Sequence, residues 1–304
     1  MFSSQTGSFP LYACLVAAAP LLAYAALILM RKRALRPDAV PAWQLALIVT
    51  ACSLAGARLT YVLFRFEDFV YGYGLPAIVN LGVGSCLMYG GIFGALIGAA
   101  LAAMGASASI PATLDELTVP GLTAIAVIRA AELFTSEGIG PLIENKTLCF
   151  FPLAVQNEYG EWNLAVFVLE AAVAAAMLIA FLRAKPQPAG ERILTALLVF
   201  SCCQIPLENL RSDSCLQVGF VRVTQVFAAL VILAVALLRA KPLGRRAMAR
   251  HATFVLLCVV GIGIIEWAQD KTNIPNFLLY VVMAALCAAM AIRLSPTARY
   301  RRTA

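Results

Sequence analysis

Nine long apolar segments follow one another along the chain. They cover residues 10–30, 43–64, 82–104, 114–134, 162–182, 191–210, 219–238, 253–269 and 275–293. Each is close to or above the roughly 20 residues that an α-helix needs to cross the hydrocarbon of a bilayer. The segments are continuous and rich in Ala and Leu, whereas the strands of a membrane β-barrel alternate with a period of two. The pattern therefore predicts nine membrane-spanning helices.

The composition supports this class of protein. Of the 304 residues, 62% are hydrophobic and 13% are charged, whereas a soluble domain has about 25% charged residues. So few charged residues cannot cover a soluble core. We therefore expect an all-α polytopic membrane protein. The first segment is not expected to be a cleaved signal peptide, because basic residues follow it rather than precede it.

Basic residues are concentrated in alternate connections, and in membrane proteins such connections face the cytoplasm. They are Arg31, Lys32, Arg33, Arg36, Arg183, Lys185, Arg192, Arg239, Lys241, Arg245, Arg246, Arg250, Arg293, Arg299, Arg301 and Arg302. The opposite connections hold only Arg65, Lys146 and Lys271, with Arg211 at a helix end. The bias predicts a multi-pass protein of the cell (plasma) membrane, with its N-terminus outside and its C-terminus in the cytoplasm. The net charge of +7 is then a topology signal and indicates no nucleic-acid partner.

The cysteines and the single histidine indicate no metal site. Most of the nine cysteines lie in apolar segments, where Cys acts as a small hydrophobic residue. Cys149 and Cys215 fall in or beside outer loops and could pair. Because His251 lies on the predicted cytoplasmic side and no Cys/His ligand spacing occurs, we expect no metal and no cofactor.

Ionisable residues occur inside the apolar segments, where a charge at mid-depth costs about 2.5–3.5 kcal/mol or more and usually marks function. They are Arg58, Arg129, Glu132, Glu170, Glu208, Arg211 and Arg222. The spacing of three residues places Arg129 and Glu132 on one helix face, and Gln204 lies one turn before Glu208. The predicted orientation brings these arginines to one depth near the outer headgroups. A guanidinium is a planar fork of donors that fits a phosphate, so we expect a site for a phospholipid headgroup. The alternative is that these charges form ion pairs that only fix helix contacts.

Glycines repeat every four residues at Gly90, Gly94 and Gly98, a pattern typical of close helix packing. The hydroxyl of Tyr89 is expected in the same outer layer as the arginines. In the long outer connection, Phe150-Phe151-Pro152-Leu153 is apolar enough to lie at the membrane surface. We expect residues 144–161 to form an ordered cover beside the site rather than a plain connector.

Several motifs, in chain order, carry a resemblance to a known family. They are Tyr12, the segment Gly56-Ala57-Arg58-Leu59-Thr60-Tyr61-Val62-Leu63-Phe64, the segment Met88-Tyr89-Gly90-Gly91-Ile92-Phe93-Gly94, the stretch 115–140 with Arg129, Glu137, Gly138 and Gly140, the pair Asn163 and Glu170, and the set Gln204, Glu208, Arg211, Asp213 and Gln225. Together they resemble the prolipoprotein diacylglyceryl transferases. The resemblance implies a seven-helix transferase-like core over residues 1–240, followed by an extension, 241–304, that adds two transmembrane helices.

The resemblance also implies an activity and a set of site residues. The family moves a diacylglyceryl group from phosphatidylglycerol to the lipobox cysteine of a prolipoprotein signal peptide, within membrane lipids. By resemblance the substrate-binding residues are Arg129, Arg58, Tyr12, Glu137, Gly140, Gln204 and Glu208, and the catalytic residues are Glu132, Tyr89 and Arg211.

The chain departs from the family pattern at three positions. Tyr89 stands for the motif histidine, Glu132 for an asparagine and Gln204 for an arginine. We expect Glu132 to take the thiol proton in place of the histidine. The alternative function is a non-catalytic lipid- or peptide-binding membrane protein on the same scaffold. A small-solute transporter is less favoured, because the polar groups lie near one face rather than at the midplane.

The predicted topology can be tested with reporter fusions. A reporter fused after Arg302 should read as cytoplasmic and one inserted near Asn157 as external, because an odd number of spans separates the basic tail from the chain's start. The measurement is the activity of a paired enzyme reporter that works on one side only. Both reporters on the same side would contradict the predicted number of spans.

Overall fold

The computed structural model describes residues 9–34, 40–80, 85–135, 137–157, 159–212, 216–218, 221–272 and 274–295. The chain forms two compact units. Unit 1 consists of residues 1–17, 125–187 and 191–304, and unit 2 consists of residues 18–124 and 188–190. The proposed division into 1–240 and 241–304 stays a prediction.

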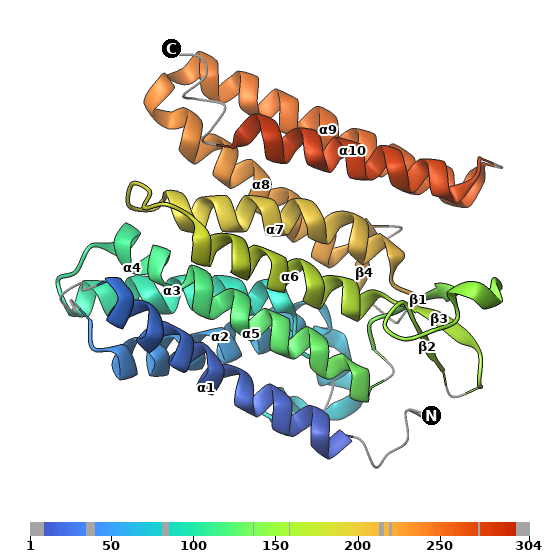
Figure 1. The fold of residues 1–304 in the computed structure, drawn as a ribbon, viewed down its shortest axis with the longest axis horizontal. Coiled ribbons are helices and arrows are strands. Elements are labelled where there is room, and N and C mark those ends of the chain that lie inside the picture. The colour runs from blue at the N-terminus through green and yellow to red at the C-terminus, as the bar shows by residue number, and fades with distance from the viewer. Residues whose placement is uncertain are drawn as a thin grey trace. The chain divides into compact units, whose positions relative to one another are not determined.

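Helices make up most of the described chain (Figure 1). They are α1 (Phe9–Ala34), α2 (Ala42–Phe64), α3 (Met88–Gly105), α4 (Ile110–Glu116), α5 (Thr118–Ala131), α6 (Val166–Arg183), α7 (Glu191–Leu210), α8 (Val223–Ala240), α9 (Arg245–Lys271) and α10 (Asn276–Leu294). Short turns of π- or 3-10 helix lie at Asp68–Tyr73, Leu75–Ile78, Glu132–Phe134, Lys146–Leu148 and Lys241–Leu243. The strands are β1 (Ile139–Leu142), β2 (Ala154–Gln156), β3 (Trp162–Ala165), β4 (Gln217–Val218) and β5 (Val221–Arg222).

Within the described ranges, nine helical stretches are long and apolar enough to cross a membrane. This confirms the all-α polytopic class and the nine predicted segments. Several predicted boundaries were wrong. The third segment starts at Met88 rather than at residue 82, and the seventh starts at Val223 rather than at residue 219. The fifth segment starts at Val166 rather than at residue 162, because Trp162–Ala165 is a strand. The eighth starts at Arg245 rather than at residue 253, because α9 includes the basic residues that precede its apolar part.

In unit 2, α2 and α3 pack backbone to backbone through the glycines that repeat along α3. A methyl group added at Gly94 would lie 2.1 Å from the carbonyl oxygen of Cys52, and one added at Gly90 would lie 2.5 Å from the carbonyl oxygen of Gly56. Gly98 faces the Cys52 side chain in the same way, at 3.0 Å. The expected close packing is therefore confirmed, and it depends on the absence of side chains at these positions.

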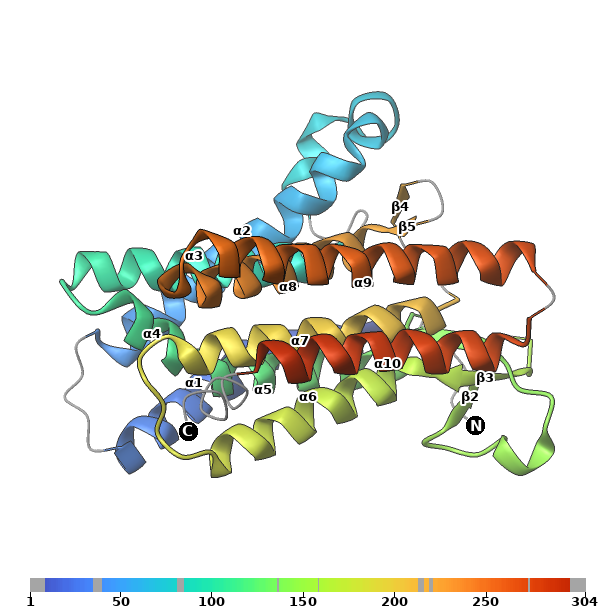
Figure 2. The same cartoon turned by 90° about the horizontal axis from the view of Figure 1, so that it is seen from above.

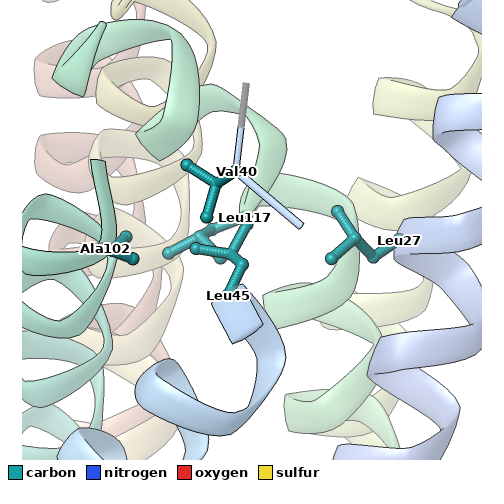
Figure 3. Close-up of a cluster of buried hydrophobic side chains, with 6 residues drawn as sticks. Leu27, Val40, Leu45, Ala102 and Leu117 are labelled. Atoms are coloured by element: carbon teal, nitrogen blue, oxygen red, sulfur yellow. The ribbon is translucent and has the colours of Figure 1, made fainter. Parts of the chain in front are cut away.

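Unit 2 contains a small apolar core (Figure 3). The side chains of Val40, Leu45 and Leu117 point toward one another there, with Leu27 of α1 and Ala102 of α3 in the same cluster. Next to this core, the guanidinium of Arg31 donates to the Glu116 carboxylate and to the Val40 carbonyl, each at 2.7 Å. The contacts join the end of α1 to α4 and to the start of α2.

In unit 1, α7, α8, α9 and α10 pack against one another, and α6 packs against α7 (Figures 1 and 2). One buried arginine ties three of these helices together. Arg239 of α8 donates to the carboxylate of Glu191 at 3.1 Å, to the hydroxyl of Thr195 at 2.7 Å and to the carbonyl of Leu294 at 2.7 Å. The first turn of α7 and the last turn of α10 are thereby fixed to α8.

A three-stranded antiparallel sheet, in the order β1-β3-β2, connects α5 with α6 along the chain. The side-chain amide of Asn163 donates to the Gly140 carbonyl at 3.0 Å, and the Ser212 amide donates to the Ile139 carbonyl at 2.8 Å. Residues 144–161 were predicted to be ordered, and residues 144–157 and 159–161, which the structure describes, form a regular turn, a strand and hydrogen-bonded loops. Their role as a cover stays a prediction. Cys149 is a free thiol, and Cys215 lies outside the described residues.

The close packing of α2 on α3 predicts a sharp difference between two glycines of α3. Gly94→Ala should destabilise the protein by about 1–3 kcal/mol, because the new methyl group overpacks the helix contact. Gly105→Ala is the matched control, since nothing lies within 4 Å of the methyl group it adds. Thermal unfolding in detergent measures both. Equal stability of the two variants would contradict the packing.

Candidate functional site

Four ionisable side chains meet inside unit 1. Arg129 comes from the end of α5, Glu132 from the turn that follows it, Glu170 from α6, and Arg211 from the residue after α7. Each is less than 10% exposed. Arg129 pairs with Glu132, and Arg211 lies 3.7 Å from the same carboxylate. Three segments that are distant in sequence therefore deliver opposite charges to one buried place.

Glu170 is the centre of this cluster. Its Oε2 atom accepts from Nη1 of Arg211 and forms an ion pair with Nε of Arg129, both at 3.1 Å. Its Oε1 atom accepts from the side-chain amide of Gln204, which also contacts Glu208 at 3.3 Å. One carboxylate thus bridges two guanidinium groups that would otherwise repel each other. Such bridging is needed because an uncompensated buried charge costs several kcal/mol.

The local sequence fixes the Glu132 side chain from one side. Gly138 has a φ of +73°, a conformation that favours glycine. A methyl group added there would lie 2.4 Å from Oε2 of Glu132 and 2.7 Å from Cβ of Phe167. The amide of Phe167 in turn donates to the Gly138 carbonyl at 2.9 Å. A side chain at position 138 would therefore push Glu132 out of the cluster.

Oε2 of Glu132 is buried and accepts no hydrogen bond from the described residues. The other oxygen of this carboxylate, Oε1, is held by Arg129. The carboxylate is therefore fixed at one oxygen and has acceptor capacity left at the other. A buried acceptor without a donor is uncommon and calls for an explanation in the chemistry of the site.

The residue before α8, Arg222, contacts the main chain of Arg211. The guanidinium of Arg222 donates to the Arg211 carbonyl, and the backbone amide of Arg222 donates to Oε1 of Gln225 at 3.2 Å. The side-chain amide of Gln225 donates to Glu266 of α9. Glu266 was not among the predicted residues. It is an ionisable residue inside an apolar segment, and this pattern identified the other buried charges.

The remaining predicted site residues lie as follows. Gly140 is buried in β1, where a methyl group would meet Val166 at 2.8 Å. Glu137 is exposed at the start of the turn before β1, and Tyr12 is partly buried in α1. Tyr89 is fully buried in unit 2, with its ring centroid 6.2 Å from that of Phe93. The substrate-binding roles of Tyr12, Glu137 and Gly140 and the catalytic role of Tyr89 stay predictions.

Arg58, also in unit 2, is engaged with main-chain oxygens. Its guanidinium donates to the carbonyls of Ala77, Ile78, Asn80 and Ser85, at distances between 2.7 and 3.0 Å. It also stacks on the ring of Phe69, 5.1 Å from the centroid. Four of the five N–H donors of an arginine are thus used to hold the connection between α2 and α3. The expected phosphate-binding role of Arg58 stays a prediction.

Among the described residues, the structure brings together Arg129, Glu132, Arg211, Gln204 and Glu208 from the predicted set, and it adds Glu170 as their bridge. No group of three or more His, Cys, Asp and Glu side chains in the described ranges could hold a metal ion. The site therefore offers cations, carboxylates and amides as its chemical groups.

Removing Arg129 tests how much the buried cluster stabilises the fold. Arg129→Ala should cost about 3–5 kcal/mol, because it leaves the carboxylates of Glu132 and Glu170 with less positive charge. Adding Glu132→Gln should recover part of that loss, since it removes one of the stranded charges. Chemical unfolding in detergent measures both variants.

Arg65→Ala is the matched control. Arg65 also pairs with an acid three residues later, Asp68, at 3.7 Å, but both side chains are nearly half exposed. An exposed pair contributes about 0–1 kcal/mol. Equal losses for Arg129→Ala and Arg65→Ala would contradict the stabilising role of the buried cluster.

Comparison with known proteins gives the family. A model of the prolipoprotein diacylglyceryl transferases matches residues 2–240. The phosphatidylglycerol–prolipoprotein diacylglyceryl transferase of Clostridium kluyveri is 26% identical over 185 residues, which are 59% of this chain and 71% of that protein. The enzyme of the same name from Clostridium botulinum (strain Langeland) is 27% identical over 192 residues, 62% of this chain and 74% of the relative. The chain belongs to the prolipoprotein diacylglyceryl transferase family.

Proposed function

We propose that this enzyme transfers a diacylglyceryl group from phosphatidylglycerol to the thiol of a lipobox cysteine in a prolipoprotein. The family and the names of the relatives support a diacylglyceryl transferase acting in lipoprotein biogenesis. The predicted topology supports a site at the outer leaflet, because the basic connections assign the ends of α5 and α7 to the outer side.

The reaction defines what the site must supply. The cysteine sulfur attacks the glycerol carbon that carries the phosphate ester, so that a C–S bond forms and a C–O bond breaks. The electron pair of the broken bond leaves with the phosphate, which departs as glycerol phosphate. The thiol proton passes to a base. The site therefore needs cations for the leaving phosphate and an acceptor for one proton.

Arg129 and Arg211 supply the cations. Both guanidinium groups face the single oxygen Oε2 of Glu170 at 3.1 Å, so their donors converge on one point. An anionic oxygen of a phosphate can be bound by the same two forks, in partial exchange for the carboxylate. As the leaving phosphate gains charge, the two arginines stabilise it more strongly than they stabilise the bound ester.

The observation that carries the proposal is the Oε2 atom of Glu132, which is buried and accepts no hydrogen bond from the described residues. It is a carboxylate oxygen in a buried cluster, fixed through Oε1 by Arg129. Its contact with Nη1 of Arg211, at 3.7 Å, is too long for a hydrogen bond. These properties suit a group that takes the thiol proton. Glu132 can thus supply the function that the family motif assigns to a histidine, at whose position this chain has Tyr89.

The second candidate is a membrane protein that binds phospholipid or a signal peptide without turnover. The observation that favours it is the pairing of both cations, since Arg129 and Arg211 each contact carboxylates of the cluster. In this alternative, Glu132 only compensates the positive charges of Arg129 and Arg211. The two candidates differ in whether Glu132 is needed for a chemical step or only for folding.

A transfer assay separates them. The purified protein is placed in vesicles that contain labelled phosphatidylglycerol, and the label on a lipobox peptide is measured. The wild type should transfer label. Glu132→Gln should lower kcat by about 100-fold or more, as expected for loss of a general base. Arg129→Lys should fold and insert yet transfer far less, because it keeps the charge and loses the planar fork.

Glu161→Gln is the control, because Glu161 is exposed and bonds only to Asn157 in the connection between β2 and β3. It should keep the wild-type rate. Saturable binding of phosphatidylglycerol by a wild type that transfers no label would overturn the enzyme proposal in favour of the binding protein.

A further inference from the structure

Two polar residues of α9 face the helices that carry the site. Glu266 and Gln269 are three residues apart, so they lie on one face of α9. Glu266 accepts from the side-chain amide of Gln225 in α8. Oε1 of Gln269 accepts from the side-chain amide of Asn209 in α7, at 3.0 Å. The helix that follows the family-matched residues thus makes two polar side-chain contacts with unit 1's site helices.

A carboxylate at position 266 is not needed to pack α9. The helix already buries Val255, Cys258, Ile262 and Ile265. Glu266 is itself only 7% exposed and lies inside a membrane-spanning helix, where a carboxylate is costly. An apolar residue of similar volume would pack there without that cost. The hydrogen bond that Glu266 accepts from Gln225 gives a reason for a carboxylate at this position.

A chain of contacts leads from Glu266 to the reacting cluster. Nε2 of Gln225 donates to Glu266, and Oε1 of the same amide accepts from the backbone amide of Arg222 at 3.2 Å. The Arg222 guanidinium donates to the carbonyl of Arg211, and Arg211 reaches Glu170 at 3.1 Å. Each step is a hydrogen bond between groups that are at least partly buried.

The carboxylate of Glu266 influences which end of the Gln225 side-chain amide faces α9. An amide presents a donor at one end and an acceptor at the other, whereas an ionised carboxylate only accepts. Glu266 therefore holds the NH₂ end of Gln225 toward α9, where the same nitrogen also reaches the Ile205 carbonyl at a longer 3.4 Å. The oxygen end must then face the Arg222 amide, where it completes the cap at the start of α8. An apolar residue at position 266 would impose no such orientation.

We propose that Glu266 is a positioning residue for the transfer reaction. It fixes Gln225, which fixes Arg222, and Arg222 holds the main chain of Arg211 so that the guanidinium faces Glu170 and Glu132. The proposal rests on the function proposed above. It assigns a part in that function to α9, which lies beyond the residues matched by the family.

The Gln269–Asn209 bond provides a matched comparison. It joins the same helix to the same bundle through one side-chain hydrogen bond. Asn209 also contacts the Met283 sulfur at 3.7 Å, and neither of these contacts involves Gln225 or Arg222. Gln269→Ala therefore removes one polar contact between α9 and α7 without disturbing the orientation of Gln225.

Kinetics in the transfer assay test the positioning role. Glu266→Ala and Glu266→Leu should lower kcat by about 10- to 100-fold, because a small displacement of a catalytic group has effects of this size. The KM for phosphatidylglycerol should change less than kcat. Glu266→Gln should restore most of the rate, since its side-chain oxygen can still accept from Gln225. Gln269→Ala should stay near the wild-type rate. Leu at position 266 keeps the volume, so it tests positioning even where Ala impairs folding.

A second measurement does not depend on turnover. Phenylglyoxal modifies accessible arginines, and mass spectrometry reports the modified fraction of each. In Glu266→Leu, labelling of Arg222 and Arg211 should rise severalfold, while Arg239, at the other end of α8, should stay protected. In Glu266→Gln and Gln269→Ala, labelling should match the wild type.

The outcomes separate the two proposals. Unchanged labelling of Arg211 and Arg222 in Glu266→Leu would overturn the positioning role, as would an equal rise at Arg239, which would show that Glu266 only docks α9. So would loss of kcat in Gln269→Ala as large as in Glu266→Leu. A wild type that transfers no label would overturn the proposed function, while the labelling pattern would still decide the link between Glu266 and Arg211.

Discussion

The candidate site depends on one carboxylate that bridges two guanidinium groups. Glu170 keeps Arg129 and Arg211 close together although their charges repel. It does so from α6, a helix that contributes no other ionisable residue to the cluster. The remaining features support this arrangement. Gly138 leaves room for Glu132, and Gln204 holds the second oxygen of Glu170. The site is therefore assembled by electrostatic compensation inside a medium that tolerates little uncompensated charge.

The sequence predicts contacts well where they follow from the period of one helix. The pairs Arg129–Glu132 and Gln204–Glu208 lie three and four residues apart, and both are in contact. Contacts between helices leave no such spacing, so Glu170 was recognised as a buried charge but not as the bridge. The start of α6 was misplaced for another reason. Trp162–Ala165 holds one polar residue, Asn163, but no Gly or Pro separates this strand from the helix that follows, so no helix-start signal marks the change.

Arg58 shows a further limit of sequence reasoning. Its four partners are all main-chain carbonyls, and a carbonyl is present at every residue whatever the side chain. A buried arginine is therefore visible in the sequence, but whether it binds a phosphate, a carboxylate or the backbone is decided by the fold. Arg129 and Arg239 illustrate the other outcomes, since the first pairs with carboxylates and the second combines a carboxylate, a hydroxyl and a carbonyl.

The contacts of Arg239 with α7 and α10 have a consequence for the order in which the helices assemble during synthesis. Arg239 and Leu294 are 55 residues apart, so the ribosome adds the last partner well after the first contacts can form. Glu191 and Thr195 precede Arg239 and are available as soon as α8 inserts. During that interval Glu191 and Thr195 of α7 can compensate the arginine. The bundle can thus remain inserted while α9 and α10 are still being synthesised, and the last turn of α10 completes the contacts of Arg239.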